Sequence, residues 1–285
     1  MNKVLKLTVV FSIGVTLLLG CKQSSPPARS VNTEVSGRVG DSIRFAGLDW
    51  TVKVHETGQW GPGPNYFSGN EQDITIDSNG YLHMKIVNRD GKWFSTEVVS
   101  DKNMGYGTYV FTIDADLEDI PENIVLGLFT WDNNTFQSDA NSEIDIEISK
   151  WGDTTDLRTL QYGVQPINFG VLYPERMHRP EYPLGKLKGL TTHGFRWSDS
   201  TITWASYSGD TYGQGELLGE WQFDTSFPAR VKEEGGSKSV PVIIPAPGSE
   251  TNARINLWIA TWYALGPANG KEQEIIIRDF DYSPL

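Results

Sequence analysis

The most constraining feature of this sequence is a strict alternation of acidic and apolar residues within residues 141–153, NSEIDIEISKWGD. Glu143, Asp145 and Glu147 alternate there with three isoleucines. Side chains of a β-strand point alternately to its two faces, and β-branched isoleucine favours strands over helices. The pattern therefore predicts a strand that buries its isoleucine face in a core and carries three carboxylates on the opposite face.

The carboxylate face of this strand has more than one interpretation. Acids two residues apart on a strand lie about 6.5 to 7 Å apart, and like charges at that spacing raise one another's pKa. A solvated face of an antiparallel sheet explains the alternation without any function. Three acids with no intervening lysine or arginine are equally typical of a functional acid cluster. A metal site is disfavoured, because three acids along one strand, without a histidine or a glycine-turned loop, give poor coordination geometry.

Short alternating runs recur through most of the chain and are bounded by glycine, asparagine, aspartate and proline. The clearest are DITID, YLHMKIV, GTYVFTID, STITWASY, INLWIATW and EIIIRDF. No segment shows a long helical period, and no internal repeat is present. Many strands with turn signals at close spacing predict a single all-β domain, a sandwich or a barrel. Residues 166–188 and 223–252 are expected to be irregular segments that border a cleft or form surface loops.

The N-terminal segment has the pattern of a secretory leader. Lys3 and Lys6 precede a charge-free run over residues 7–20, which is short for a transmembrane helix and ends at Cys21. The sequence LLGC resembles the lipobox of bacterial lipoproteins, in which the cysteine becomes the acylated first residue. Cys21 is the only cysteine of the chain, so an intramolecular disulfide is excluded.

This pattern predicts the organisation of the chain. We expect a lipoprotein signal peptide over residues 1–20, a tether rich in serine and proline over residues 21–33, and one folded domain over residues 34–285. A lipid on Cys21 would anchor that domain to a bacterial membrane in the cell envelope, outside the cytoplasm.

Charge and aromatic content narrow the class of ligand. The chain has a formal net charge of −12, and loss of Lys3 and Lys6 with the leader takes it to −14. So acidic a surface argues against nucleic acid and anionic membrane surfaces as partners, and it suits an uncharged ligand. Aromatic residues make up 12% of the chain, and several tryptophans lie beside polar amides. Such pairs suit sugar rings and their hydroxyls, although core packing explains any single tryptophan.

The segment SEIDIEIS resembles the E-x-D-x-E catalytic signature of glycoside hydrolase family 16, in the form found in lichenases and xyloglucan-active members. The resemblance extends over most of the domain, because GYGTYVFTI, GLFTW, WSDSTITWASYSGD and INLW follow the order and intervals of that family's strands. It implies a concanavalin A-like β-jelly-roll sandwich of two curved antiparallel sheets, whose concave face forms the substrate cleft.

The resemblance also implies roles for the three acids. Glu143 would be the nucleophile, Glu147 the general acid/base, and Asp145 the helper that separates their pKa values. Retaining hydrolysis needs two carboxyls about 5 to 5.5 Å apart. The Cα atoms of the two glutamates would lie about 13 Å apart on a flat strand, so side chains leaning together on a concave sheet would close much of that gap.

Further residues match positions at which members of the family bind substrate or metal. The substrate-binding residues implied by the resemblance are Glu97, Trp131, Gln161 and Trp258. Many members of the family bind a structural calcium on the convex face. Asp281 and the carbonyl group of Gly80 are the residues implied for that metal here.

Together these observations predict a retaining, endo-acting β-glycanase that hydrolyses β-glycosidic bonds of a β-glucan-like polysaccharide, needs no cofactor for catalysis and is a monomer. Two alternatives stay open. One is a non-catalytic carbohydrate-binding protein of the same fold, because fold does not fix function; the presence of all three acids disfavours it. The other is a transglycosylase, which passes the same covalent intermediate to a sugar acceptor and which the sequence does not distinguish from a hydrolase.

Overall fold

The computed structural model describes residues 37–39, 41–135, 140–167, 174–226, 230–233, 236–239 and 244–285. These residues belong to one compact unit, Glu34–Leu285. The predicted signal peptide, Cys21 and the predicted tether lie outside the described residues. Within the described ranges, no helix is long and apolar enough to span a membrane.

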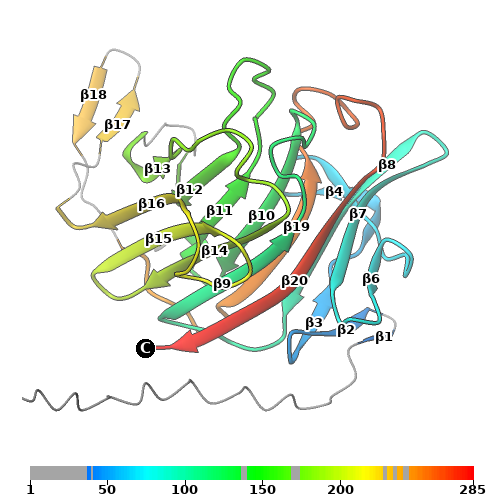
Figure 1. The fold of residues 1–285 in the computed structure, drawn as a ribbon, viewed down its shortest axis with the longest axis horizontal. Helices are drawn as coiled ribbons and strands as arrows, with labels where there is room; N and C mark the ends of the chain where they lie inside the picture. The colour runs from blue at the N-terminus through cyan, green and yellow to red at the C-terminus, as the bar shows by residue number, and fades with distance from the viewer. Residues whose placement is uncertain are drawn as a thin grey trace, which may run out of the picture. The chain divides into compact units, whose positions relative to one another are not determined.

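The unit is a β-sandwich in which neighbouring strands run antiparallel, apart from one short parallel pairing (Figure 1). One layer is ordered β1 (Gly37–Val39), β2 (Ser42–Phe45), β3 (Leu48–Val52), β8 (Lys92–Ser100), β19 (Asn252–Ile259), β10 (Ile124–Trp131), β11 (Ile144–Ile148), β12 (Leu160–Val164) and β13 (Met177–His178). The other layer is ordered β6 (Ile74–Ile76), β7 (Leu82–Arg89), β20 (Gln273–Pro284), β9 (Gly107–Asp114), β14 (Leu190–Trp197), β15 (Thr201–Ser208) and β16 (Leu217–Asp224). The predicted all-β jelly-roll class is confirmed.

Short elements complete the sandwich. The β7–β8 hairpin connects the two layers, and β5 pairs with both β4 and β8. Strand β4 covers His55–Trp60, and strand β5 covers Asn65–Phe67. The two 3-10 turns are η1 (Ala140–Ser142) and η2 (Pro174–Arg176).

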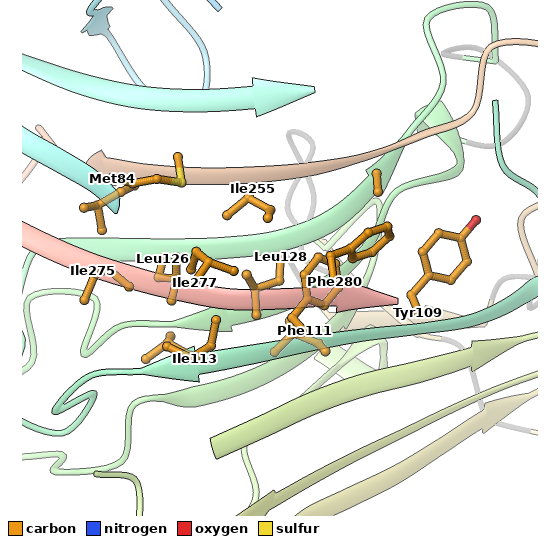
Figure 2. Packing of buried hydrophobic residues seen from close by; sticks show 14 of the residues in the cluster. Met84, Tyr109, Phe111, Ile113, Leu126, Leu128, Ile255, Ile275, Ile277 and Phe280 are labelled. Atoms are coloured by element: carbon orange, nitrogen blue, oxygen red, sulfur yellow. The ribbon is translucent and has the colours of Figure 1, made fainter. Parts of the chain in front are cut away.

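The hydrophobic core lies between the two layers, and Figure 2 shows part of it. Ile144, Ile146 and Ile148 of β11 are fully buried in this core, as the alternation predicts. The same cluster contains Phe111 of β9 and Ile277 of β20, from the facing layer. Burial of each isoleucine side chain contributes about 1.5 to 3 kcal/mol. The register of β11 is therefore strongly specified, and it turns the acids to the face away from the core.

The two segments expected to be irregular contain regular structure. Residues 223–252 include the hairpin of β17 (Arg230–Glu233) and β18 (Gly236–Ser239). Residues 166–188 include η2 and the two-residue strand β13. The expectation was wrong in these places because polar runs such as RVKE and GSKS lack the apolar alternation that marks strands with one buried face.

Candidate active site

The acids of β11 lie in rows of side chains that cross neighbouring strands. Residues paired across antiparallel strands point to the same face, and the register pairs Glu147 with Gln161 of β12 and with Gly127 of β10. Gly127 pairs in turn with Asn256 of β19, and Asn256 pairs with Glu97 of β8. Five strands thus contribute one row to the face that lies opposite the core.

A second row lies two residues along the strands. Asp145 pairs with Gly163 of β12 and with Phe129 of β10, and Phe129 pairs with Arg254 of β19. The rows line a pocket of about 460 Å³. Its lining residues are Lys53, Trp60, Gly61, Pro62, Glu97, Gly127, Phe129, Trp131, Asn133, Glu143, Asp145, Glu147, Arg254, Asn256 and Trp258. All three predicted catalytic acids therefore lie together in one cleft.

The chain that leads into β11 fixes the position of Glu143. Asn141 of η1 has a left-handed backbone (φ 63°), a conformation that asparagine tolerates better than most residues. Its side-chain amide donates a hydrogen bond to the Asp132 carbonyl oxygen at 2.6 Å. The Thr130 hydroxyl donates to the Ser142 carbonyl oxygen at 2.8 Å. The Asp132 N–H also donates to the Asn141 carbonyl oxygen at 2.6 Å, so these hydrogen bonds tie the backbone just before Glu143 to the end of β10.

Asp145 is buried and Glu143 and Glu147 are half-buried, and this partial loss of solvent raises the pKa values of all three acids. Burial, together with the charges of Asp145 and Glu147, raises the pKa of Glu143 well above its usual value, while the Arg254 guanidinium acts in the opposite direction. Burial raises the pKa of Asp145 to about 7. Burial and the charge of Asp145 raise the pKa of Glu147 to about 8. The cluster therefore holds protons at neutral pH, as a general acid must.

Two glutamine side chains hold the carboxyl groups in place. Gln161 Nε2 donates to Glu147 Oε2 at 2.8 Å, and Gln165 Nε2 donates to Asp145 Oδ2 at 2.9 Å. Each amide donor favours the ionised carboxylate and lowers its pKa, but burial outweighs the donor in both cases. Gln161, predicted from the resemblance to contact substrate, is 4% exposed and orients the carboxyl of Glu147.

Glu97 lies in the wall of the pocket between two cations. Its side chain is fully buried; Lys53 Nζ donates to Oε2 at 2.9 Å, and Arg254 Nη1 donates to Oε1 at 3.2 Å. Burial lowers the pKa of Lys53 against the opposing effect of the Glu97 charge. Because both of its carboxylate oxygens are paired, the buried Glu97 side chain fixes the positions of Lys53 and Arg254. Direct contact of Glu97 with a substrate stays a prediction.

The two predicted aromatic positions lie on opposite sides of the rows, in opposite directions along the strands. The antiparallel register puts Trp131 toward the Glu143 end and Trp258 toward the Glu147 end, and both side chains line the pocket. Trp258 is 5% exposed, and its ring centroid lies 6.0 Å from that of Trp151. The cleft thus has an aromatic side chain on each side of the acids.

The sequence analysis missed four polar residues of the pocket, Lys53, Asn133, Arg254 and Asn256. Period two places Arg254 and Asn256 on the same strand face as Trp258, and that spacing was the available signal. Asn256 is 2% exposed, and its Oδ1 has no hydrogen-bond partner among the described residues. This atom lies over Gly127, where an added Cβ would come within 2.4 Å of it. Asn256 also lines the pocket, so this buried acceptor lies at the pocket wall, in the row of Glu147.

The residues implied for calcium supply few ligands. Asp281 is exposed on β20 and accepts a hydrogen bond from the Ser283 hydroxyl at 3.2 Å. Gly80 lies in the turn before β7, where its N–H donates to the Asp77 carbonyl oxygen. Calcium takes six to eight oxygen ligands, and the described ranges contain no group of three or more His, Cys, Asp or Glu side chains suited to a metal. Asp281 and Gly80 alone do not complete such a shell of ligands. Calcium binding stays a prediction.

Comparisons with known proteins give matches to solved structures. Scans against protein-family models and curated proteins find no match. A Bacillus licheniformis β-glucanase has a TM-score of 0.55 and 17% identity, with 87% of this chain and 100% of that chain covered. A Bacteroides ovatus mixed-linkage glucan GH16 protein in complex with a product has a TM-score of 0.55 and 12% identity, with 82% and 94% covered. The fold is that of family 16 β-glucanases.

Another similar structure shows that this fold does not decide activity. A Mycobacterium tuberculosis antigen described as a pseudo β-1,3-glucanase has a TM-score of 0.54 and 17% identity, with 82% of this chain and 91% of that chain covered. The expected likeness of fold is confirmed, whereas activity has to be argued from the site itself.

The raised pKa values predict how stability depends on pH. Unfolded Glu and Asp titrate near about pH 4, so between about pH 4.5 and 8 the folded chain binds more protons than the unfolded chain, and the free energy of unfolding falls as pH rises. Glu147→Gln removes one such group. We expect it to raise the free energy of unfolding by about 1 to 3 kcal/mol at about pH 8 and to change it little at about pH 5.

Urea unfolding followed by tryptophan fluorescence at the two pH values measures this difference. Glu71→Gln, at an exposed glutamate outside the pocket, is the matched control and should show no such pH-dependent gain. An equal effect of Glu147→Gln at both pH values would contradict the raised pKa.

Proposed function

We propose that this chain is a retaining, endo-acting β-glycanase that cleaves β-glycosidic bonds of a β-glucan-like polysaccharide. The observation that carries the proposal is a pair of glutamates that line one pocket, Glu143 directly before β11 and Glu147 within it. Burial raises the pKa of Glu147 to about 8, and Glu143 lies four residues away in the same pocket. An acid that keeps its proton at neutral pH, beside a second carboxyl, is the equipment that retaining hydrolysis requires.

The proposed reaction has two displacements. In the first, the Glu143 carboxylate attacks the anomeric carbon while Glu147 gives its proton to the glycosidic oxygen, so the bond to the leaving sugar breaks as the bond to Glu143 forms. In the second, ionised Glu147 takes a proton from water, the water oxygen attacks the anomeric carbon, and Glu143 is released. Each step inverts the anomeric carbon, so the product retains the β configuration.

Glu143 has to be ionised to attack. The charges of Asp145, Glu147 and Arg254 determine how readily it loses its proton. Protonation of Asp145, whose pKa is about 7, and of Glu147 removes two negative charges that oppose ionisation of Glu143. The Arg254 charge lowers the pKa of Glu143 further. Under this proposal Glu147 and Asp145 hold the protons, and Glu143 gives its own up.

Three observations support a polysaccharide as the substrate. Aromatic side chains lie on both sides of the acids, suited to the C–H faces of sugar rings. Asn256 lines the pocket, and its amide is of the type that hydrogen-bonds sugar hydroxyls. The pocket is lined by residues of four neighbouring strands, β11, β10, β19 and β8, and a site that crosses several strands suits internal positions of a polymer.

A non-catalytic glycan-binding protein is the second candidate, and one observation favours it. Burial and two neighbouring acids raise the pKa of Glu143 well above its usual value, and a protonated Glu143 is no nucleophile. In that case all three acids would act as hydrogen-bonding groups for sugar hydroxyls.

Chemical rescue tests the roles of the two glutamates. Glu147→Ala should lose most activity on polysaccharide, because the alkoxide leaving group needs its proton. It should still react with an activated aryl β-glycoside, and added azide should then release the β-glycosyl azide. Glu143→Ala lacks the nucleophile, so azide should attack in a single displacement and give the α-glycosyl azide. NMR of the products distinguishes the two anomers.

The matched control is Glu71→Ala, which removes an exposed glutamate outside the pocket and should keep wild-type activity. Exchanged anomers would mean that the two roles are reversed. Wild-type rates in both acid variants would exclude β11 from catalysis, and glycan binding without turnover by the wild type would establish the second candidate.

We also propose that Cys21 carries a lipid that anchors the domain to a bacterial membrane. The support is the lipobox-like LLGC sequence at the end of a charge-free run. Cys21→Ala should leave an unprocessed precursor that takes up no acyl label, and Cys21→Ser is the conservative companion. Normal acyl labelling and membrane fractionation of either variant would contradict the proposal.

A further inference from the structure

Strand β11 is also held from behind, on the side that faces the other layer of the sandwich. Trp204 of β15 belongs to that layer and is 2% exposed. Its indole Nε1 donates to the Asp145 carbonyl oxygen at 3.1 Å, across 59 residues of sequence. One buried hydrogen bond therefore joins the facing layer to the backbone of the middle acid.

Neighbouring aromatic rings hold the Trp204 indole in its orientation. The ring centroid of Trp221, on β16, lies 4.7 Å from that of Trp204, with the planes 28° apart. The centroid of Tyr162, on β12, lies 6.1 Å from it, with the planes 23° apart. Tyr162 is itself tied to β15, because its hydroxyl donates to Ser206 Oγ at 2.7 Å. Rings packed this closely leave little room for another rotamer, so the direction of the Trp204 N–H is fixed.

The backbone and the carboxyl of Asp145 each receive a hydrogen bond from a side chain. A carbonyl oxygen has two lone pairs, so the Asp145 carbonyl can accept from Trp204 in addition to a sheet hydrogen bond. Gln165 Nε2 donates to the Asp145 carboxyl at 2.9 Å. The Trp204 donor sets where the backbone of Asp145 lies, and the Gln165 donor sets how its carboxyl is turned.

The need to satisfy a buried indole does not explain this choice of acceptor. A buried indole N–H requires a hydrogen-bond partner, and a local carbonyl can supply it. Trp50 is fully buried and donates at the same distance, 3.1 Å, to the Phe45 carbonyl oxygen within the β2–β3 hairpin. Trp204 instead reaches across the core to the residue between the two glutamates. The two hydrogen bonds are alike in kind and length, and what differs is the residue that each one holds.

We propose that Trp204 is a positioning residue for the double displacement, because its indole N–H fixes the backbone of Asp145 and thereby the spacing of this acid from Glu143 and Glu147. This inference rests on the proposed function. The charge of Asp145 raises the pKa of both glutamates, and the strength of such an effect depends on distance. A displacement of about 1 Å at a catalytic group can cost about 100-fold in rate.

Replacement of Trp204 by benzothienylalanine, introduced at this position alone, tests the inference, because sulfur takes the place of the N–H while the ring system keeps its shape. We expect kcat on mixed-linkage β-glucan to fall by about tenfold. KM should change by less than about twofold, because the residues that line the pocket are unchanged. Weaker coupling between Asp145 and Glu147 should move the alkaline limb of the pH–rate profile to lower pH. Trp204→Phe should change kcat and the profile in the same directions.

The matched control is the same replacement at Trp50, which lies outside the pocket. Both replacements should lower the urea midpoint of unfolding to a similar extent, but only the one at Trp204 should change kcat and the pH–rate profile. Equal kinetics of the two folded analogues, or an unshifted profile for the Trp204 analogue, would overturn the inference and leave the proposed function standing. Absence of turnover by the wild type would overturn the proposed function and the role of Trp204 with it.

Discussion

Three carboxyl groups lie close together at the start of β11 and within it, Asp145 buried and Glu143 and Glu147 half-buried in the pocket, and the rest of the site is arranged around this electrostatic constraint. The opposite face of the strand packs three isoleucines into the core. Because side chains alternate, the hydrophobic register fixes the acids as well: a slip of one residue would expose the isoleucines and turn the acids into the core. Burial of the three isoleucines is worth on the order of 5 to 9 kcal/mol.

The neighbours of the acids determine how the protons are shared among them. Gln161 and Gln165 each donate one hydrogen bond to a carboxyl without adding charge. Glu97 pairs with both Lys53 and Arg254. Two cations and one carboxylate together give a net positive charge beside the acid cluster. Buried ion pairs of this kind add little stability by themselves. Their effect here is electrostatic, because the Arg254 charge favours ionisation of Glu143 while Glu147 keeps its proton.

Local periodicity was sufficient to predict β11, its buried face and the face that carries the acids, because alternation is a property of consecutive residues. It was not sufficient to predict the partners of the acids. Arg254 and Glu97 are 157 residues apart in sequence, and only the pairing of β19 with β8 brings them together. Trp151 has a left-handed backbone (φ 55°), and this was equally hidden, because no rule of sequence places a bulky residue there. The hairpin of β17 and β18 was missed because its strands are polar, so a pattern based on apolar alternation does not detect them.

The central claim is that two carboxyls of one strand perform a double displacement, and the stereochemistry of the first product tests it most directly. Proton NMR of wild-type protein acting on mixed-linkage β-glucan records the anomer released before mutarotation. The account predicts that the β-anomer appears first and that the α-anomer grows in only as the sugar equilibrates. First appearance of the α-anomer would contradict a covalent intermediate on Glu143, and binding of the glucan without any product would show that the acids of β11 hold sugars and do not cleave them.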